Sequence, residues 1–120
     1  MKTARYALLA LMCMAGHANA EAEFRSAVPE AACYYENVFL STSPALNVID
    51  RIDYRGASAK VIVVHKQWFK SHQSVRANIA LAIYCRIRVE HGSGRVDVTN
   101  QQGSPYGTVV DGSWQDFFTD

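Results

Sequence analysis

The first twenty residues limit what this chain can fold into, because they have the features of a secretory signal peptide. Lys2 and Arg5 form a short basic start, an apolar run covers residues 6–15, and Ala18 to Ala20 supplies the small residues of a cleavage site. We therefore expect cleavage before Glu21 and export. The short basic start and alanine-rich exit are typical of bacteria, so the protein is predicted to be periplasmic or secreted.

The remaining residues 21–120 are predicted to form one domain. A chain of about 100 residues encloses a single modest hydrophobic core and is too short for two. The apolar run of the signal is shorter than the about twenty residues that cross a bilayer, and no later run exceeds it. No transmembrane anchor is therefore expected.

Two cysteines remain after cleavage, because Cys13 leaves with the signal. In an oxidising compartment, an even pair such as Cys33 and Cys85 indicates a disulfide. The closed loop of about fifty residues corresponds to roughly 4 kcal/mol of stabilisation in the chain-entropy estimate. The alternative is a redox pair, although catalytic dithiols usually lie only two residues apart.

The pattern of apolar and turn-forming residues predicts an α+β fold. The expected order is helix, two strands, helix, two strands, with the helices packed on one face of a mainly antiparallel sheet. Ser26 is a plausible cap for the first helix, Pro44 follows its end, and Ser71 or Ser74 could cap the second. The helices are expected at 27–40 and 68–87, and the strands at 46–54, 60–65, 95–99 and 106–110.

The segment from Ile79 to Val89 carries two conflicting patterns. Its apolar residues alternate with Ala80, Ala82 and more polar residues, which is the period of a β-strand. We prefer a helix because the two alanines lie inside the run and the preceding apolar residues are already in helical phase. The alternative of a long strand remains open at this point.

Charges are segregated along the chain. The segment 55–95 carries eight basic residues against Glu90 alone, whereas acids outnumber bases in both flanking segments. One interpretation is a basic face for an anionic partner. The other is that the acidic flanks fold over the basic centre and neutralise it.

Within this basic segment, four residues are candidates for partner binding: Lys66, Trp68, Lys70 and Arg76. Lysines that flank an aromatic pair combine positive charge with a stacking surface, as binding sites for single-stranded nucleic acid or sugar polymers do. The alternative is that Trp68 belongs to the core and the lysines are merely solvated. Trp114, Phe117 and Phe118 are similarly expected to cover the sheet, although they could form an exposed docking strip.

Two histidines and an aspartate are the candidates for catalysis. His65 and His72 lie on either side of a short segment, and Asp50 or Asp53 could add a carboxylate, as in a minimal hydrolase or a metal site. None of the usual metal-binding spacings is present, and neither GxSxG nor a phosphate-binding loop occurs. We therefore assign no catalytic residue, no metal and no cofactor.

These observations favour a small exported non-catalytic binding protein, such as an inhibitor, an immunity factor or an accessory subunit of an envelope assembly. The expected partner is another envelope protein or an anionic envelope component, and nucleic acid is not favoured. Two alternatives remain. One is a minimal cell-wall or phosphoester hydrolase that uses His65, His72 and an aspartate, and the other is an anionic-polymer binder that uses the segment Arg55–Arg95.

Overall fold

The computed structural model describes residues 31–118, so the predicted signal peptide and the expected start of the first helix lie outside the described residues. The elements follow the predicted order, with additions. The helices are α3 (Tyr34–Leu40), α4 (Ala45–Val48), α5 (His65–Lys70) and α6 (Gln73–His91). The strands are β1 (Ile49–Arg55), β2 (Ser58–Val63), β3 (Arg95–Thr99), β4 (Pro105–Val110) and β5 (Ser113–Asp116).

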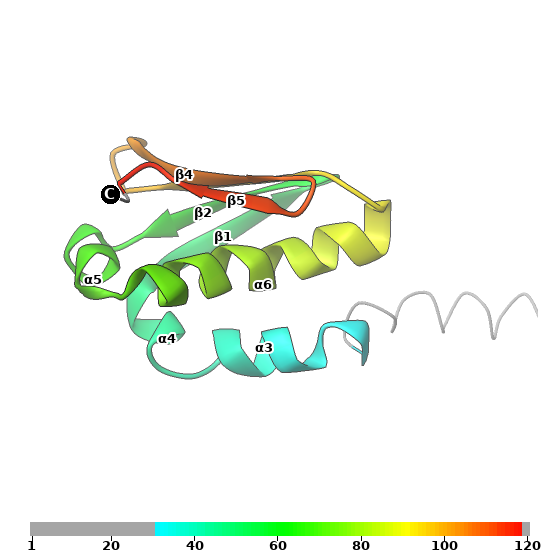
Figure 1. Ribbon diagram of the computed structural model, residues 1–120, viewed down its shortest axis with the longest axis horizontal. Coiled ribbons are helices and arrows are strands. Elements are labelled where there is room, and N and C mark those ends of the chain that lie inside the picture. The colour runs from blue at the N-terminus through cyan, green and yellow to red at the C-terminus, as the bar shows by residue number, and fades with distance from the viewer. Residues whose placement is uncertain (1–30, 119–120) are drawn as a thin grey trace, which may run out of the picture.

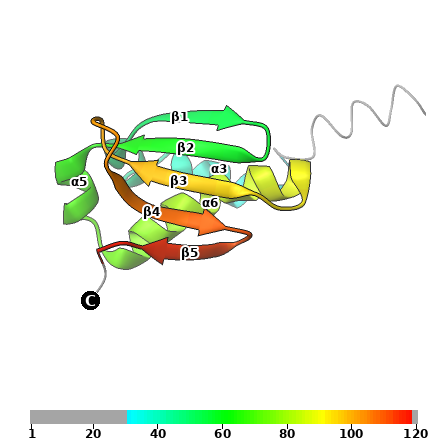
Figure 2. The ribbon, with the colours of Figure 1, turned by 90° about the horizontal axis from the view of Figure 1, so that it is seen from above.

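The five strands form one sheet in the order β1-β2-β3-β4-β5. All neighbours are antiparallel except β2 and β3, which run parallel at the centre. A parallel pair needs a crossover connection, and α5 and α6 provide it. Figures 1 and 2 show α6 crossing beneath the sheet, with α3 and α4 on the same side. The predicted α+β class and the one-sided packing of the helices are confirmed.

Three elements differ from the prediction. The strand β5 and the short helix α4 were not expected, and the second predicted helix is divided into α5 and α6. The division occurs because Ser71 and His72 both have extended backbones, with ψ of 143° and 151°. The cap predicted for the second helix, Ser71 or Ser74, was wrong: His72 is the N-cap of α6, and its Nδ1 accepts a hydrogen bond of 3.1 Å from the backbone N–H of Ser74. The predicted cap Ser26 lies outside the described residues.

The conflict over residues 79–89 resolves as helix. Ile79, Ile83 and Ile87 are 0%, 0% and 1% exposed and face the buried strand residues Val61, Val96 and Val98. In an alternating pattern, every second apolar residue lies four positions from the next. Residues four positions apart also lie on the same face of a helix. The alternating pattern was therefore compatible with a helix whose isoleucines cover the sheet.

The predicted disulfide is present. Cys33 and Cys85 are bonded and buried, with Cα atoms 6.0 Å apart, and they join the start of α3 to the middle of α6. None of the seven residues of α3 is fully buried, and only Phe39 and Leu40 pack partly against the core. The disulfide is therefore a principal attachment of α3 to the rest of the domain.

Candidate functional site

The face of the sheet opposite the helices carries charged side chains in register. Asp53 on β1 pairs with Lys60 on β2, which pairs in turn with Asp97 on β3. Arg51 lies 3.3 Å from Asp53, and Arg95 lies 2.9 Å from Asp97. Because acids and bases alternate across this face, part of the predicted basic segment is locally neutralised.

Another arginine of the basic segment lies at the edge between α6 and the sheet. Arg86 places its guanidinium 4.8 Å from the centroid of the Tyr54 ring and 3.4 Å from the carboxylate of Glu90. Burial raises the pKa of Tyr54, while the Arg86 charge lowers it and the Glu90 charge raises it. The net direction is upward, so Tyr54 is a neutral phenol that packs beneath Arg86.

Two of the four predicted partner-binding residues lie inside the molecule. Trp68 is 0% exposed, and Arg76 is 5% exposed. The Nε atom of Arg76 lies 2.9 Å from the carboxylate of Asp116 on β5, and its guanidinium lies 5.8 Å from the centroid of the Trp68 ring. Both residues therefore connect the helices to the edge of the sheet, and neither contributes to a surface.

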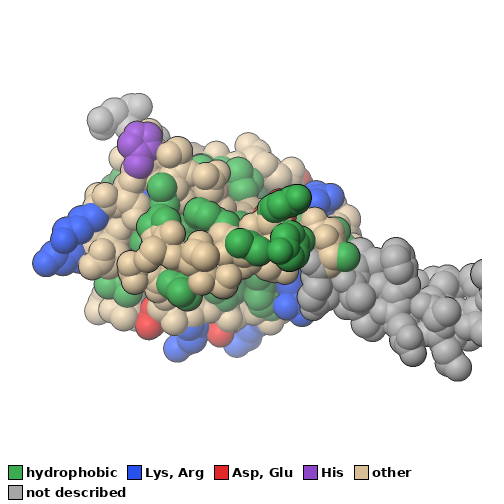
Figure 3. Space-filling view, turned by 90° about the horizontal axis from the view of Figure 1, so that it is seen from below, with side chains coloured by type: hydrophobic (Ala, Val, Ile, Leu, Met, Phe, Trp, Pro, Cys, Tyr) green, Lys and Arg blue, Asp and Glu red, His purple; other side chains and the backbone are tan. Residues whose placement is uncertain are grey.

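The other two predicted residues, Lys66 and Lys70, lie on the exposed side of α5. They are spaced by four residues and form a basic stripe on this helix. His65 and Phe69 have the same spacing and form a second, aromatic stripe, with ring centroids 4.9 Å apart. Basic side chains project from this end of the molecule in Figure 3.

Phe118 extends the aromatic stripe from the other end of the chain. Its ring centroid lies 5.1 Å from that of Phe69, and the two side chains are 50% and 38% exposed. We define the α5 surface as His65, Lys66, Phe69, Lys70 and Phe118. Of the three aromatic residues expected to cover the sheet, Trp114 packs against the core, whereas Phe117 and Phe118 are exposed.

A buried tyrosine supports this surface from below. The ring of Tyr106 on β4 packs against Phe69 and Phe118, with centroids 5.1 and 5.5 Å apart. Its hydroxyl contacts Nδ1 of His65 through a short hydrogen bond and accepts a 3.2 Å hydrogen bond from Nδ2 of Asn100. His65 and Asn100 follow β2 and β3, so the carboxyl ends of the parallel pair place these groups together.

The residues of the predicted hydrolase site have separate partners. His65 is hydrogen-bonded to Tyr106, His72 caps α6, and Asp53 pairs with Arg51. Within residues 31–118, no group of three or more His, Cys, Asp or Glu side chains is arranged to hold a metal ion. The structure therefore does not assemble these histidines and aspartates into one site.

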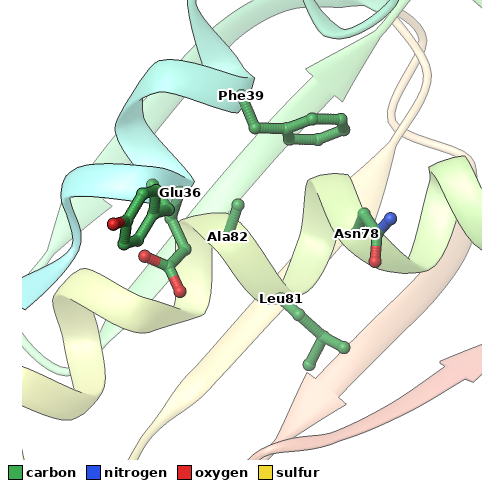
Figure 4. A pocket seen from close by; sticks show the side chains of 6 residues that line it. Glu36, Phe39, Asn78, Leu81 and Ala82 are labelled. Atoms are coloured by element: carbon green, nitrogen blue, oxygen red, sulfur yellow. The ribbon is translucent and has the colours of Figure 1, made fainter.

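A second surface feature lies between α3 and α6 and was not predicted from sequence. It is a groove of about 320 Å³ (Figure 4), and Figure 3 looks onto this helical face, where exposed hydrophobic side chains gather. Tyr35 and Leu81, on opposite sides, are 82% and 37% exposed. The adjacent tyrosines Tyr34 and Tyr35 in the predicted first helix were the available sequence signal. The groove is lined by Tyr35, Glu36, Phe39, Asn78, Leu81 and Ala82.

None of the helices in the described range 31–118 combines the length and the apolar character needed to span a membrane. Comparison of the chain with protein-family models, with curated proteins and with solved structures found no match to any of them.

Proposed function

We propose that this protein is a small exported non-catalytic binding protein that recognises an acidic partner through the α5 surface. The proposal rests on the two stripes of α5, where exposed lysines lie directly beside exposed aromatic rings. The basic stripe attracts an acidic partner during encounter, and the aromatic stripe supplies apolar area that is buried on contact.

The α5 surface is held on a rigid base, which favours binding. Trp68, in the middle of α5, is fully buried, and its ring stacks near that of Tyr106 with centroids 6.5 Å apart. A fixed platform loses little conformational freedom when a partner docks. Adjacent basic and apolar groups suit a polypeptide that carries both acidic and apolar side chains better than a polymer that carries only anions.

Binding to a copolymer of glutamate and tyrosine tests this function. Replacing both lysines (Lys66→Gln with Lys70→Gln) should weaken binding and flatten its dependence on salt, because charge attraction is screened over about 10 Å at 0.1 M. Phe69→Ala with Phe118→Ala should weaken binding without changing the salt dependence. Calorimetric titration at several salt concentrations measures both effects.

The control is Lys60→Gln, which removes one positive charge from the open face of the sheet and should leave binding unchanged. The proposal is refuted if the lysine variants bind the copolymer as the unmodified protein does. Equal or tighter binding of inorganic polyphosphate, insensitive to the phenylalanine changes, would favour the anionic-polymer alternative.

Export is the other part of the proposal, and it is tested by mass. Protein recovered from the envelope fraction should have the intact mass of a chain that begins at Glu21 and lacks the two hydrogens lost in the Cys33–Cys85 bond. Recovery of the uncleaved chain from the cytosol would contradict export. Two free thiols in the envelope form would contradict an oxidising compartment.

A further inference from the structure

We infer that His65 is a fixed hydrogen-bond donor that receives a carboxylate of the partner on the α5 surface. The inference rests on the proposed function and identifies the group that gives it specificity. It is carried by a chain of hydrogen bonds that runs from the β3–β4 turn to the imidazole of His65.

The chain begins at Asn100, whose side-chain orientation is determined by the backbone. Its Oδ1 accepts hydrogen bonds from the backbone N–H groups of Gln102 and Ser104, at 2.9 and 2.8 Å. Because only the oxygen of the amide can accept both, the other atom must be Nδ2, which is a donor. Nδ2 therefore donates to the hydroxyl of Tyr106 at 3.2 Å.

The direction of this bond determines the next one. The Tyr106 side chain is 4% exposed, so its hydroxyl proton needs a partner within the protein. The neighbouring acceptor is Nδ1 of His65, which makes the short contact described above. Tyr106 therefore donates to Nδ1, and the proton of the neutral imidazole is on Nε2.

Because Nδ1 contacts Tyr106, Nε2 is the nitrogen left to bind a partner, and His65 is itself exposed. A carboxylate that docks there accepts the Nε2–H bond within the field of Lys66 and Lys70. Phe69, packed edge-on against the imidazole, offers apolar contact for a neighbouring side chain. The geometry fits an acidic polypeptide segment in which a carboxylate lies next to an apolar residue.

Asn100→Asp tests the inference because it reverses the chain of hydrogen bonds. The introduced carboxylate accepts the Tyr106 proton, so the Tyr106 hydroxyl must accept from His65, and the imidazole proton moves to Nδ1. The unprotonated Nε2 then repels a carboxylate. Nitrogen NMR of the imidazole at about pH 8 reports the tautomer directly.

We expect Nε2–H in the unmodified protein and Nδ1–H in the Asn100→Asp variant, with binding of the glutamate–tyrosine copolymer weakened by about tenfold or more. Gln101→Glu adds the same charge on an exposed neighbour outside the chain and should change neither the tautomer nor the binding. His65→Leu should weaken binding by a similar factor. If Asn100→Asp does not fold, this variant tests whether the imidazole of His65 contributes to binding.

Two results would overturn the donor role alone: an Nδ1–H tautomer in the unmodified protein, or undiminished copolymer binding by the folded Asn100→Asp variant despite its changed tautomer. Failure of the unmodified protein to bind the copolymer would instead overturn both the donor role and the proposed acidic partner. The tautomer and the copolymer binding of the unmodified protein thus distinguish failure of the donor role from failure of the proposed function.

Discussion

Asp116→Asn should lower the free energy of unfolding by about 3–5 kcal/mol, the usual effect of breaking a buried ion pair. The side chains of Arg76 and Asp116 are only 7% and 2% exposed, and their charged atoms lie 2.9 Å apart. Removing the carboxylate leaves the guanidinium buried without its counter-charge. The asparagine oxygen can still accept from the backbone N–H of Phe118, but its Nδ2 then faces the guanidinium. Urea unfolding measures the change.

The matched control is Asp53→Asn, which removes a carboxylate from an exposed ion pair whose side chains are 65% and 42% exposed. Pairs of this kind contribute about 0 to 1 kcal/mol. A double change, Arg76→Met with Asp116→Leu, should recover most of the stability because neither buried charge remains. Equal effects of Asp116→Asn and Asp53→Asn would show that the pair of Arg76 and Asp116 is solvated.

Replacing both Cys33 and Cys85 by alanine should lower the free energy of unfolding by about 4 kcal/mol. The bond closes a sequence separation of 52 residues, and small domains have only about 5–15 kcal/mol in total. Because α3 contributes no fully buried residue, its backbone amides should lose most of their protection from hydrogen exchange. Urea unfolding and hydrogen exchange measure these effects.

The single variants provide an internal control, because the bond is already lost when one cysteine is removed. Each should be destabilised nearly as much as the double variant. Unchanged stability in the double variant, together with loss of a thiol-reductase activity, would show that the cysteines are a redox pair.

Local signals in the sequence were sufficient for most of the elements. The β-branched run before His65 and the alternation after Gly94 predicted β2 and β3, and the even cysteine pair predicted the disulfide. The strand β5 was missed because its four residues include Trp114, which resembled a residue of a terminal aromatic cover. Its identity as a strand depends on pairing with β4, which is a tertiary effect.

The candidate site was only partly predictable. Lys66 and Lys70 were assigned to a surface and are exposed, but Arg76 was placed with them because arginine is usually exposed. Its burial depends on Asp116, forty residues later in the chain, and no local pattern indicates that pairing. The contact of Asn100, Tyr106 and His65 likewise depends on the register of three strands.

The central parallel pair has a consequence for how the chain folds. The hairpin β1–β2 and the meander β3–β4–β5 each join strands that are consecutive in the chain, so each can form from nearby residues. Only β2 and β3 must be brought together across both α5 and α6, as Ala59 and Val96 are. The entropy of closing that loop is lost before the pairing compensates for it. We therefore expect docking of the α6 isoleucines onto both halves of the sheet to limit the folding rate. The Cys33–Cys85 bond ends within α6, so it does not shorten the β2–β3 connection.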